Sequence, residues 1–307
     1  MSLKEVKSKI RAVKKTHQVT KAMEAISAVK MRRSQASALE TRPFALHAIG
    51  LMRRLIHRGV TADHDLVQER ETVDKVLLIV ITSDRGLAGS LNSYVLRTAH
   101  RLIDEHGWGK EQLAILAIGK KGYEHFEKRG YEVVEHLERW GEGVAMGDPD
   151  KLARNLIDEY TKRTYDRVLL VYSNFNSTFS QEPVVHRLLP ITFNALEEVI
   201  DGIVPERGKY SELKDVAMAD TPNKYIFEPS PRAVLDELLP YLLGIVLYHS
   251  VLEANASEHS ARMVAMKSAS DRARDLTKEL TLVYNKERQT AITAEVSEIT
   301  SGIEAMR

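Results

Sequence analysis

The chain has 307 residues, of which 43% are hydrophobic and 28% charged, and its formal net charge is +1. This length allows one to three domains with a real hydrophobic core, which excludes an intrinsically disordered protein. Cysteine is absent, which excludes disulfides, thiolate metal sites and thiol switches and indicates a reducing compartment.

The sequence predicts neither a membrane-spanning segment nor a secretory signal. No apolar run is expected to reach the roughly 18 residues that span a bilayer, and the N-terminus lacks the apolar core of a secretory signal. An organellar transit peptide is the alternative for a basic N-terminus, but Glu5 and the regular pattern from Leu3 onward favour mature sequence. We expect a soluble protein or one peripheral to a membrane.

The first predicted element is a helix of some 55 residues that starts almost at the N-terminus. Ser2 and Glu5 have the spacing of a capping box, in which each side chain satisfies a free backbone N–H. Pro43 is expected to kink the helix, which continues to about Gly59. Its apolar stripe is predicted to comprise Leu3, Val6, Ile10, Val13, Thr20, Ala22, Met23, Ala25, Ile26 and Ala28.

This first segment is strongly basic. Residues 1–58 contain 14 Lys and Arg against three Glu, a net charge of +11. Such a helix suits nucleic acid, an anionic membrane surface or an acidic protein partner, and charge alone does not choose among them. Aromatic side chains for base stacking are missing before Phe44. A solvated coiled-coil flank is the alternative without a partner.

The middle of the chain changes period. After a polar linker at residues 60–74, strands alternate with helices, which predicts a βαβ domain with a parallel sheet. Strands are expected at 75–83, 113–118, 131–135 and 167–173, with a further strand or pair at 184–192. Helices are expected at 89–106, 121–128 and 150–163. Residues 198–228 are interpreted as an irregular connection.

The last predicted element is a helix from Ser230 to the C-terminus, roughly 100 Å long. Ser230 is the expected N-cap and Pro231 the first helical residue, whereas Pro240 is expected to kink the helix. The predicted stripe is Leu239, Leu242, Ile245, Val246, Leu276, Leu280, Val283, Ile292, Val296, Ile299 and Ile303, with coiled-coil spacing at its end.

Two long terminal helices satisfy each other most simply as a pair. The predicted fold is α/β: a long antiparallel coiled coil of N- and C-terminal helices with an inserted Rossmann-like βαβ domain. The predicted domains are 1–58 and 229–307 for the coiled coil and 59–228 for the insertion, including the connection at 198–228.

The local motif SDRGLAGSLN, residues 83–92, joins a strand to a helix, where dinucleotide folds bind phosphate. It lacks the third glycine of G-x-G-x-x-G and the Gly-Lys-Ser/Thr of a phosphate loop. A tight turn or protein docking is therefore favoured over nucleotide binding. The spacing of the 11 histidines gives no zinc helix, and we find no catalytic constellation, no metal site and no cofactor site.

Four segments together resemble the gamma subunit of F-type rotary ATP synthases. They are LKEVKSKIRAVKKTHQVTKAMEAISAVKMRRSQ near the N-terminus, SDRGLAGSLN, YIFEPSP at 225–231, and SEHSARMVAMKSASDRARDLTKELTLVYNKERQTAITAEVSEITSGIEA at the C-terminal end. The resemblance covers essentially the whole chain. It implies a non-catalytic rotor shaft that turns inside a ring of alpha and beta subunits, with catalysis on the beta subunits.

The resemblance also implies contact residues. A first set, facing the acidic lever of the beta subunit, is Met23, Lys30, Arg33, Arg85, Gly86, Leu87 and Ala88. A second set, forming polar catches with the catalytic subunits, is Arg262, Arg288, Gln289, Thr293, Glu295 and Glu298. A foot that meets the membrane c-ring and the epsilon subunit is Tyr225, Phe227 and Glu228.

The implied location is the cytoplasmic face of the bacterial plasma membrane, peripheral to it, with no nucleic acid and no direct small-molecule substrate as partners. The absence of cysteine excludes the redox dithiol of the chloroplast form. A coiled-coil scaffold or nucleic-acid-binding protein is the alternative, and a nucleotide-dependent enzyme using the βαβ domain is a third class.

Overall fold

The computed structural model describes residues 2–57, 64–140, 144–192 and 228–306. Contacts divide the chain into two compact units, one of residues 1–28 with 262–307 and the other of residues 29–261. Two helices run through both: α1, Leu3–His57, and α7, Pro231–Glu304. The domain boundaries expected from the sequence stay a prediction.

A five-stranded sheet forms the centre of the second unit, in the order β3-β2-β1-β4-β5. Its strands are β1 (Val76–Ile81), β2 (Leu113–Ile118), β3 (Glu132–Leu137), β4 (Arg167–Phe175) and β5 (Gln181–Leu189). The first four are mutually parallel, as predicted, whereas β5 is antiparallel to β4. A five-residue connection is too short for a parallel crossover, so β5 returns as a hairpin.

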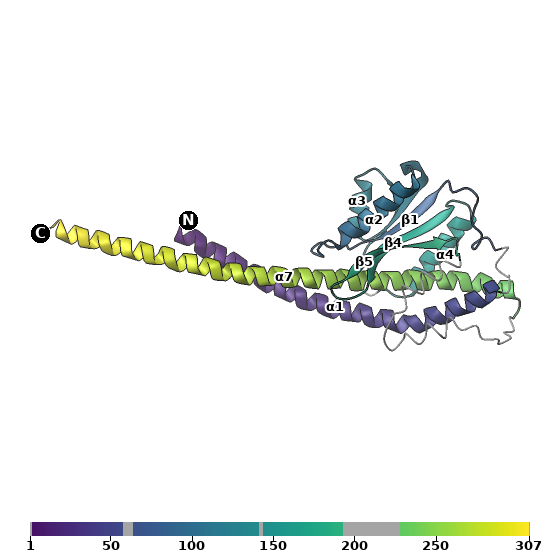
Figure 1. The fold of residues 1–307 in the computed structure, drawn as a ribbon, viewed down its shortest axis with the longest axis horizontal. Coiled ribbons are helices and arrows are strands. Elements are labelled where there is room, and N and C mark those ends of the chain that lie inside the picture. The colour runs from purple at the N-terminus through teal and green to yellow at the C-terminus, as the bar shows by residue number, and fades with distance from the viewer. Residues whose placement is uncertain (1, 58–63, 141–143, 193–227, 307) are drawn as a thin grey trace. The chain divides into compact units, whose positions relative to one another are not determined.

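Helices cover both faces of this sheet (Figure 1). Leu78 and Val80 of β1 join a cluster with α2 (Leu91–His106) and α3 (Lys120–Glu127), whereas Leu77 and Ile79 point to the other face. This alternation is what a strand buried on both faces requires. The second cluster includes α4 (Gly147–Thr161), the end of α1 and the first half of α7. A short 3-10 helix, η1 (Lys110–Gln112), precedes β2.

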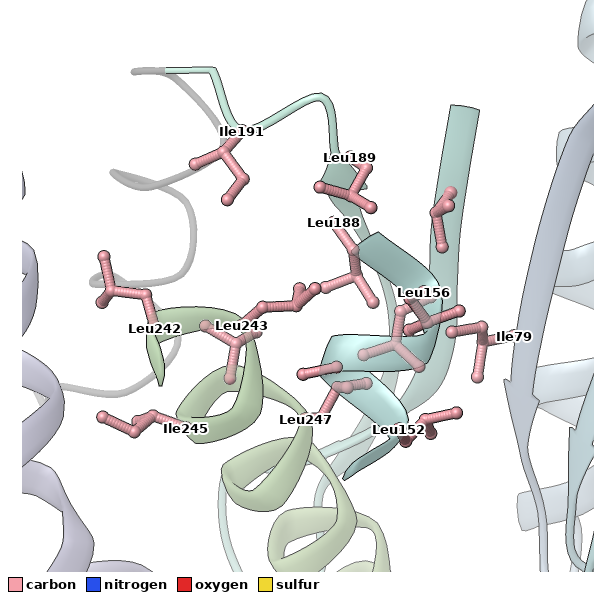
Figure 2. Packing of buried hydrophobic residues seen from close by; sticks show 14 of the residues in the cluster. Ile79, Leu152, Leu156, Leu188, Leu189, Ile191, Leu242, Leu243, Ile245 and Leu247 are labelled. Carbon is pink, nitrogen blue, oxygen red and sulfur yellow. The ribbon is translucent and has the colours of Figure 1, made fainter. Parts of the chain in front are cut away.

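Figure 2 shows how the second cluster joins α7 to the sheet. Leu243 and Leu247 of α7 point toward Leu152 and Leu156 of α4, and Leu242 belongs to the same cluster. One stretch of 18 residues in α7 has a mean hydropathy of 1.4, enough by length and composition to cross a membrane, but 61% of it is buried inside the protein. The expectation that no stretch is long and apolar enough is therefore wrong, and the apolarity serves this core.

The segment after α1 is not a simple linker. Leu66 is buried, and its carbonyl oxygen accepts a hydrogen bond from the Ile191 backbone N–H at 2.7 Å. Arg70 donates to Asp166 at 2.6 Å and to the Tyr160 carbonyl at 2.5 Å. The expected polar linker is thus packed and hydrogen-bonded from residue 64 onward, because its few apolar and charged side chains find buried partners.

The first unit is a pair of helices. The capping box is confirmed: the Ser2 N–H lies 3.0 Å from Glu5 Oε2, and the Glu5 N–H lies 3.3 Å from Ser2 Oγ. His17 of α1 lies against Ser270 of α7, with Nδ1 3.0 Å from the Ser270 carbonyl oxygen. Within this unit, buried or half-buried positions follow a heptad pattern, listed here in chain order: Leu3, Val6, Ile10, Val13, His17, Thr20, Glu24 and Ser27, then Met266, Ser270, Ala273, Thr277, Leu280 and Tyr284.

The predicted apolar stripes of α1 and α7 are therefore each wrong in one part. Ala22, Ala25 and Ile26 of α1 lie on the exposed face, and Ile26 is 56% exposed. On α7 the predicted seam of Ile292, Val296, Ile299 and Ile303 is 52–63% exposed. His17 is level with Ser270, and the two helices are antiparallel. The N-terminal end of α1 therefore lies near residue 284 of α7, and the last turns of α7 pass beyond it (Figure 1).

Candidate interaction surfaces

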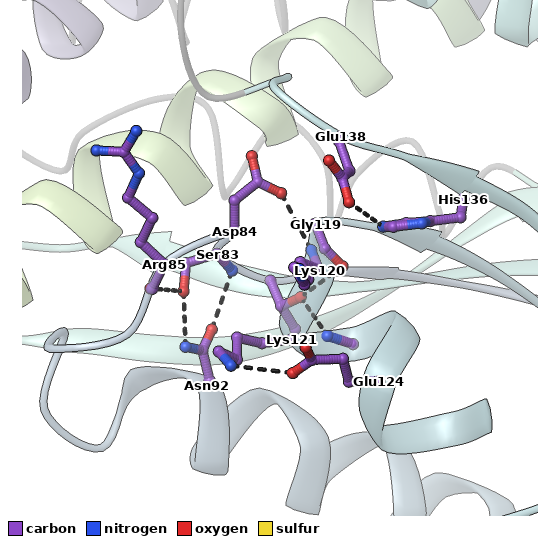
Figure 3. A network of polar contacts seen from close by, with 12 residues as sticks. Ser83, Asp84, Arg85, Asn92, Gly119, Lys120, Lys121, Glu124, His136 and Glu138 are labelled. Atoms are coloured by element: carbon purple, nitrogen blue, oxygen red, sulfur yellow. Dashed lines mark hydrogen bonds and ion pairs between the residues drawn. The ribbon is translucent and has the colours of Figure 1, made fainter. Parts of the chain in front are cut away.

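The turn between β1 and α2 is held by its own polar side chains (Figure 3). The Ser83 N–H donates to Asn92 Oδ1 at 3.0 Å, and Asn92 Nδ2 donates to Ser83 Oγ at 2.7 Å. Ser83 Oγ in turn donates to the Arg85 carbonyl at 2.7 Å. These bonds fix the backbone of residues 83–85 at the carboxyl end of β1, so Arg85 is displayed from a rigid base.

Asp84 lies in the turn after β1 but binds the start of α3, the helix that follows β2. Its Oδ1 accepts from the Lys120 N–H at 3.0 Å, at the start of α3, and its Oδ2 accepts from the Arg139 N–H at 2.9 Å. A carboxylate at a helix N-terminus satisfies free N–H groups and complements the helix dipole. The chain thus fills the anion position at the start of α3 with its own side chain.

The four residues of the turn predicted to meet the beta subunit differ in exposure. Arg85, Gly86 and Leu87 are exposed, and Leu87 has a φ of 64° with 62% of its surface accessible. Ala88 is buried. The exposed part of this surface is therefore residues 85–87, with Ala88 anchoring the turn.

The remaining predicted contacts lie on the long helices. On α1, Met23 and Lys30 are half-buried and Arg33 is exposed. On α7, Arg262 is 7% exposed, so most of its side chain is covered within this chain. The other α7 residues are exposed: Arg288, Gln289, Thr293, Glu295 and Glu298. The Thr293 hydroxyl donates to the Gln289 carbonyl at 2.9 Å.

The predicted foot is only partly described. Tyr225 and Phe227 lie outside the described residues. Glu228 is exposed and borders a mainly apolar hollow of about 390 Å³, which is also lined by Val234, Leu238 and Tyr241. The confirmed N-cap follows directly, since Ser230 Oγ accepts from the Ala233 N–H at 3.2 Å.

One polar cluster was not predicted from the sequence. The Tyr172 hydroxyl of β4 lies 3.3 Å from Glu253 Oε2 of α7 and 3.2 Å from His186 Nε2 of β5, and all three side chains are buried. Burial lowers the pKa of His186 to about 4. Burial first, and then the charge of Glu253, raise the pKa of Tyr172 well above its ordinary value. No spacing signal revealed this cluster, because its members come from three elements.

The histidines form no metal site among the residues that the structure describes, where no group of three or more His, Cys, Asp or Glu side chains could hold an ion. His100 and His125 do meet, with their Nε2 atoms 2.8 Å apart. Burial, and then the neighbouring charges of Arg129 and His100, lower the pKa of His125 to about 4. Arg129 also approaches His125 Nδ1 at 3.2 Å, so a second cation would be repelled there.

Comparisons with known proteins cover the whole chain. The family model described as ATP synthase matches residues 2–306. The ATP synthase gamma chain of Roseiflexus castenholzii is 42% identical over 306 residues, 99% of this chain and 98% of the relative. That of Heliobacterium modesticaldum is 36% identical over 304 residues, 99% of each chain.

Solved structures have the same fold at lower identity. A chain of the mitochondrial ATP synthase central stalk and c-ring from Tetrahymena thermophila matches with a TM-score of 0.59 at 23% identity, over 82% of this chain and 99% of that one. One from the Euglena gracilis mitochondrial ATP synthase matches with a TM-score of 0.63 at 18% identity, over 99% and 94%. Given the full-length identity to curated relatives, the chain belongs to the ATP synthase gamma chain family.

Proposed function

We propose that this chain is the rotor shaft of an ATP synthase, which couples rotation of a membrane c-ring to conformational cycling of a ring of alpha and beta subunits. The chain itself catalyses nothing, and ATP chemistry belongs to the beta subunits. The central observation is the end of α7, which passes beyond α1 with an exposed apolar stripe. Such a stripe needs a surrounding protein surface, because a large exposed apolar patch marks an interaction site.

The side chains at this end differ around the helix. At 3.6 residues per turn, Ile292, Val296 and Ile299 fall within a sector of about 60°. Arg288, Glu295 and Glu298 fall on one flank of that sector, and Gln289 and Thr293 on the other. As the shaft turns, each surrounding subunit would meet apolar, charged and neutral polar surface in sequence. Only such differential contacts can shift a subunit between conformations.

The partner surfaces follow from this role. We assign residues 85–87, Met23, Lys30 and Arg33 to contact with the beta-subunit lever. To the polar catches with the catalytic subunits we assign Arg288, Gln289, Thr293, Glu295 and Glu298 of α7. We also assign Arg262 to these catches; most of its side chain is already covered by other residues of this chain. The foot around Glu228, with its apolar hollow, is assigned to the c-ring and epsilon subunit. The location we propose is the cytoplasmic face of a bacterial plasma membrane.

Co-assembly tests this function directly. The full chain is produced together with the alpha, beta and epsilon subunits of the same organism, and the complex is weighed by native mass spectrometry. We expect one copy of this chain per ring of three alpha and three beta subunits, with ATPase activity that requires it. Failure to enter the ring would overturn the proposal. Steeply salt-dependent DNA binding by the isolated chain would favour the nucleic-acid-binding alternative instead.

A further inference from the structure

Helix α7 meets the sheet through two stretches of different chemistry. From Leu235 to Leu247 the buried residues of α7 are apolar and join the main core. From Ser250 onward, Val251 and Ala254 still join that core, but the side chains that hydrogen-bond the sheet and its hairpin are polar. They are Ser250, Glu253, Ser257 and Ser260, each at most 4% exposed. Their spacing of three, four and three residues puts them on one face of the helix. We call these four residues the polar ladder.

The polar ladder follows β4 and the turn after it. Tyr172 OH lies 3.3 Å from Glu253 Oε2, Ser257 Oγ donates to the Ser173 carbonyl at 3.0 Å, and Ser260 Oγ donates to the Thr178 carbonyl at 2.7 Å. Ser250 also hydrogen-bonds Tyr172. Successive turns of α7 are thus tied to successive positions of the sheet, from the middle of β4 to the hairpin tip.

The proton positions in the cluster around Tyr172 are set by its chemistry. A carboxylate can only accept, so the single hydroxyl proton of Tyr172 goes to Glu253. The hydroxyl oxygen then accepts from His186, which therefore carries its proton on Nε2. Tyr172 is held from both sides, by β5 and by α7, and all three side chains are buried. A small rotation of α7 would break this arrangement.

The two stretches resist rotation of α7 differently. Apolar contacts are non-directional, so a small turn of the helix about its axis changes them only gradually. Hydrogen bonds depend on distance and angle, and a buried group that loses its partner is strongly penalised. The polar ladder therefore fixes the rotational setting of α7 on the sheet, which the apolar stretch alone does not.

We propose that the polar ladder carries torque between the sheet-bearing unit and the shaft, with Glu253, Ser257 and Ser260 as positioning residues for coupling. This inference rests on the proposed rotor function, in which torque enters the second unit at the foot and leaves along α7. Without the polar ladder, α7 would turn about its own axis relative to the sheet under load. Part of each rotation would then not be transmitted along the shaft.

The test uses the complete ATP synthase in sealed vesicles, where ATP hydrolysis and proton pumping are both measured. A triple variant, Tyr172→Phe with Ser257→Ala and Ser260→Ala, removes the four hydrogen bonds of the polar ladder while keeping the side chains close in volume. We expect hydrolysis near the wild-type rate and at least a twofold lower ratio of protons pumped to ATP hydrolysed when pumping against a gradient. The conservative variant Glu253→Gln keeps an acceptor for Tyr172 and should keep most of the ratio.

The control for general destabilisation is Ile245→Val, in the apolar stretch of the same helix. It should lower the thermal midpoint by a few degrees and leave the ratio unchanged. The inference is overturned if the triple variant pumps with the wild-type ratio, or if Ile245→Val lowers the ratio equally. If the triple variant does not assemble, Ser257→Ala alone decides in the same assay. A wild-type chain that supports no coupled pumping would instead refute the rotor function itself.

Discussion

Gly119 sits so close to Thr82 that a Cβ on Gly119 would lie 2.0 Å from the Thr82 carbonyl oxygen. Gly119 also has a φ of 96°, a conformation that L side chains rarely adopt. We predict that Gly119→Ala lowers the free energy of unfolding by more than about 2 kcal/mol, through both clash and backbone strain. A urea titration of the full chain measures it.

The matched control is Gly86→Ala in the neighbouring turn. Nothing lies within 4 Å of a Cβ at Gly86, and its φ is not positive. The unfolding midpoint should therefore stay within error of the wild type. Equal losses at the two glycines would contradict the close approach at Gly119.

His186 should make stability depend on pH. Its pKa is about 4 in the folded chain against an ordinary value of 6.5, so between these values the unfolded state binds the extra proton. Stability that is complete above pH 6.5 is therefore lost as the pH falls toward 4, by on the order of 3 kcal/mol. His186→Gln, which can still donate to Tyr172, should flatten this part of the profile.

The comparison for that profile is His125→Gln. His125 also has a pKa of about 4, but it is more accessible to solvent, so its contribution to the slope should be smaller. Urea titrations at pH 4.5, 5.5, 6.5 and 7.5, values chosen to bracket the window at roughly one-unit steps, measure both variants. A wild-type slope that survives His186→Gln would show that other groups produce it.

Arg70 should not be replaceable by lysine. Its guanidinium donates to the Asp166 carboxylate and to the Tyr160 and Tyr165 carbonyls, and it lies 4.2 Å from the centre of the Tyr160 ring. An ammonium group cannot make this planar set of contacts. We expect Arg70→Lys to cost about 2 kcal/mol of unfolding free energy. Exposed Arg101, replaced in the same way, should cost nothing measurable.

The pair of helices should fail at a proline. Leu280 is half-buried in the seam of the first unit, and a proline there removes a backbone hydrogen bond and clashes with the preceding turn, at a cost of about 3 kcal/mol. Circular dichroism of Leu280→Pro should show lost helix, and the assembled enzyme should lose rotation-coupled synthesis. Leu282→Ala, on the exposed face, is the control. Full synthesis by Leu280→Pro would contradict the shaft role.

Arg288 should matter for activity and not for folding. Its side chain is exposed on α7. We expect Arg288→Ala to leave the helix content unchanged and to alter the ATPase rate of the complex, through lost charge-assisted hydrogen bonds of roughly 1.5–3 kcal/mol. Lys286→Ala is the neighbouring control. Unaltered hydrolysis and coupling in Arg288→Ala would remove Arg288 from the catch.

Local signals in the sequence were enough for most elements. The Ser2–Glu5 capping box, the Ser230 N-cap and the continuous apolar run of β1 each depend on residues close together in the chain, and each is confirmed. The partner of a helix face is not local. The spacing of Ile26 and Ile292 predicts that they lie in a seam, but α1 pairs there through a neighbouring face that carries Glu24 and Ser27.

The candidate site was predicted in part for the same reason. The motif around Arg85 is contiguous and could be read as a docking turn, whereas the fixing of that turn by Asp84 depends on Lys120 and Arg139, far away in the sequence. The polar ladder was missed because a buried Ser257 and a solvated serine have the same local pattern. Only the approach of β4 distinguishes them.

The unpaired end of α7 bears on how such a subunit comes to be made. A single amphipathic helix gains little from its own hydrogen bonds in water, so the turns beyond residue 284 should fray in the free chain. Contact with another protein would then stabilise these turns as helix. The C-terminal end of α7 would then become fully helical only inside the assembled complex. An unassembled chain would expose an apolar, protease-sensitive C-terminal segment, and proteolysis there would remove the chain.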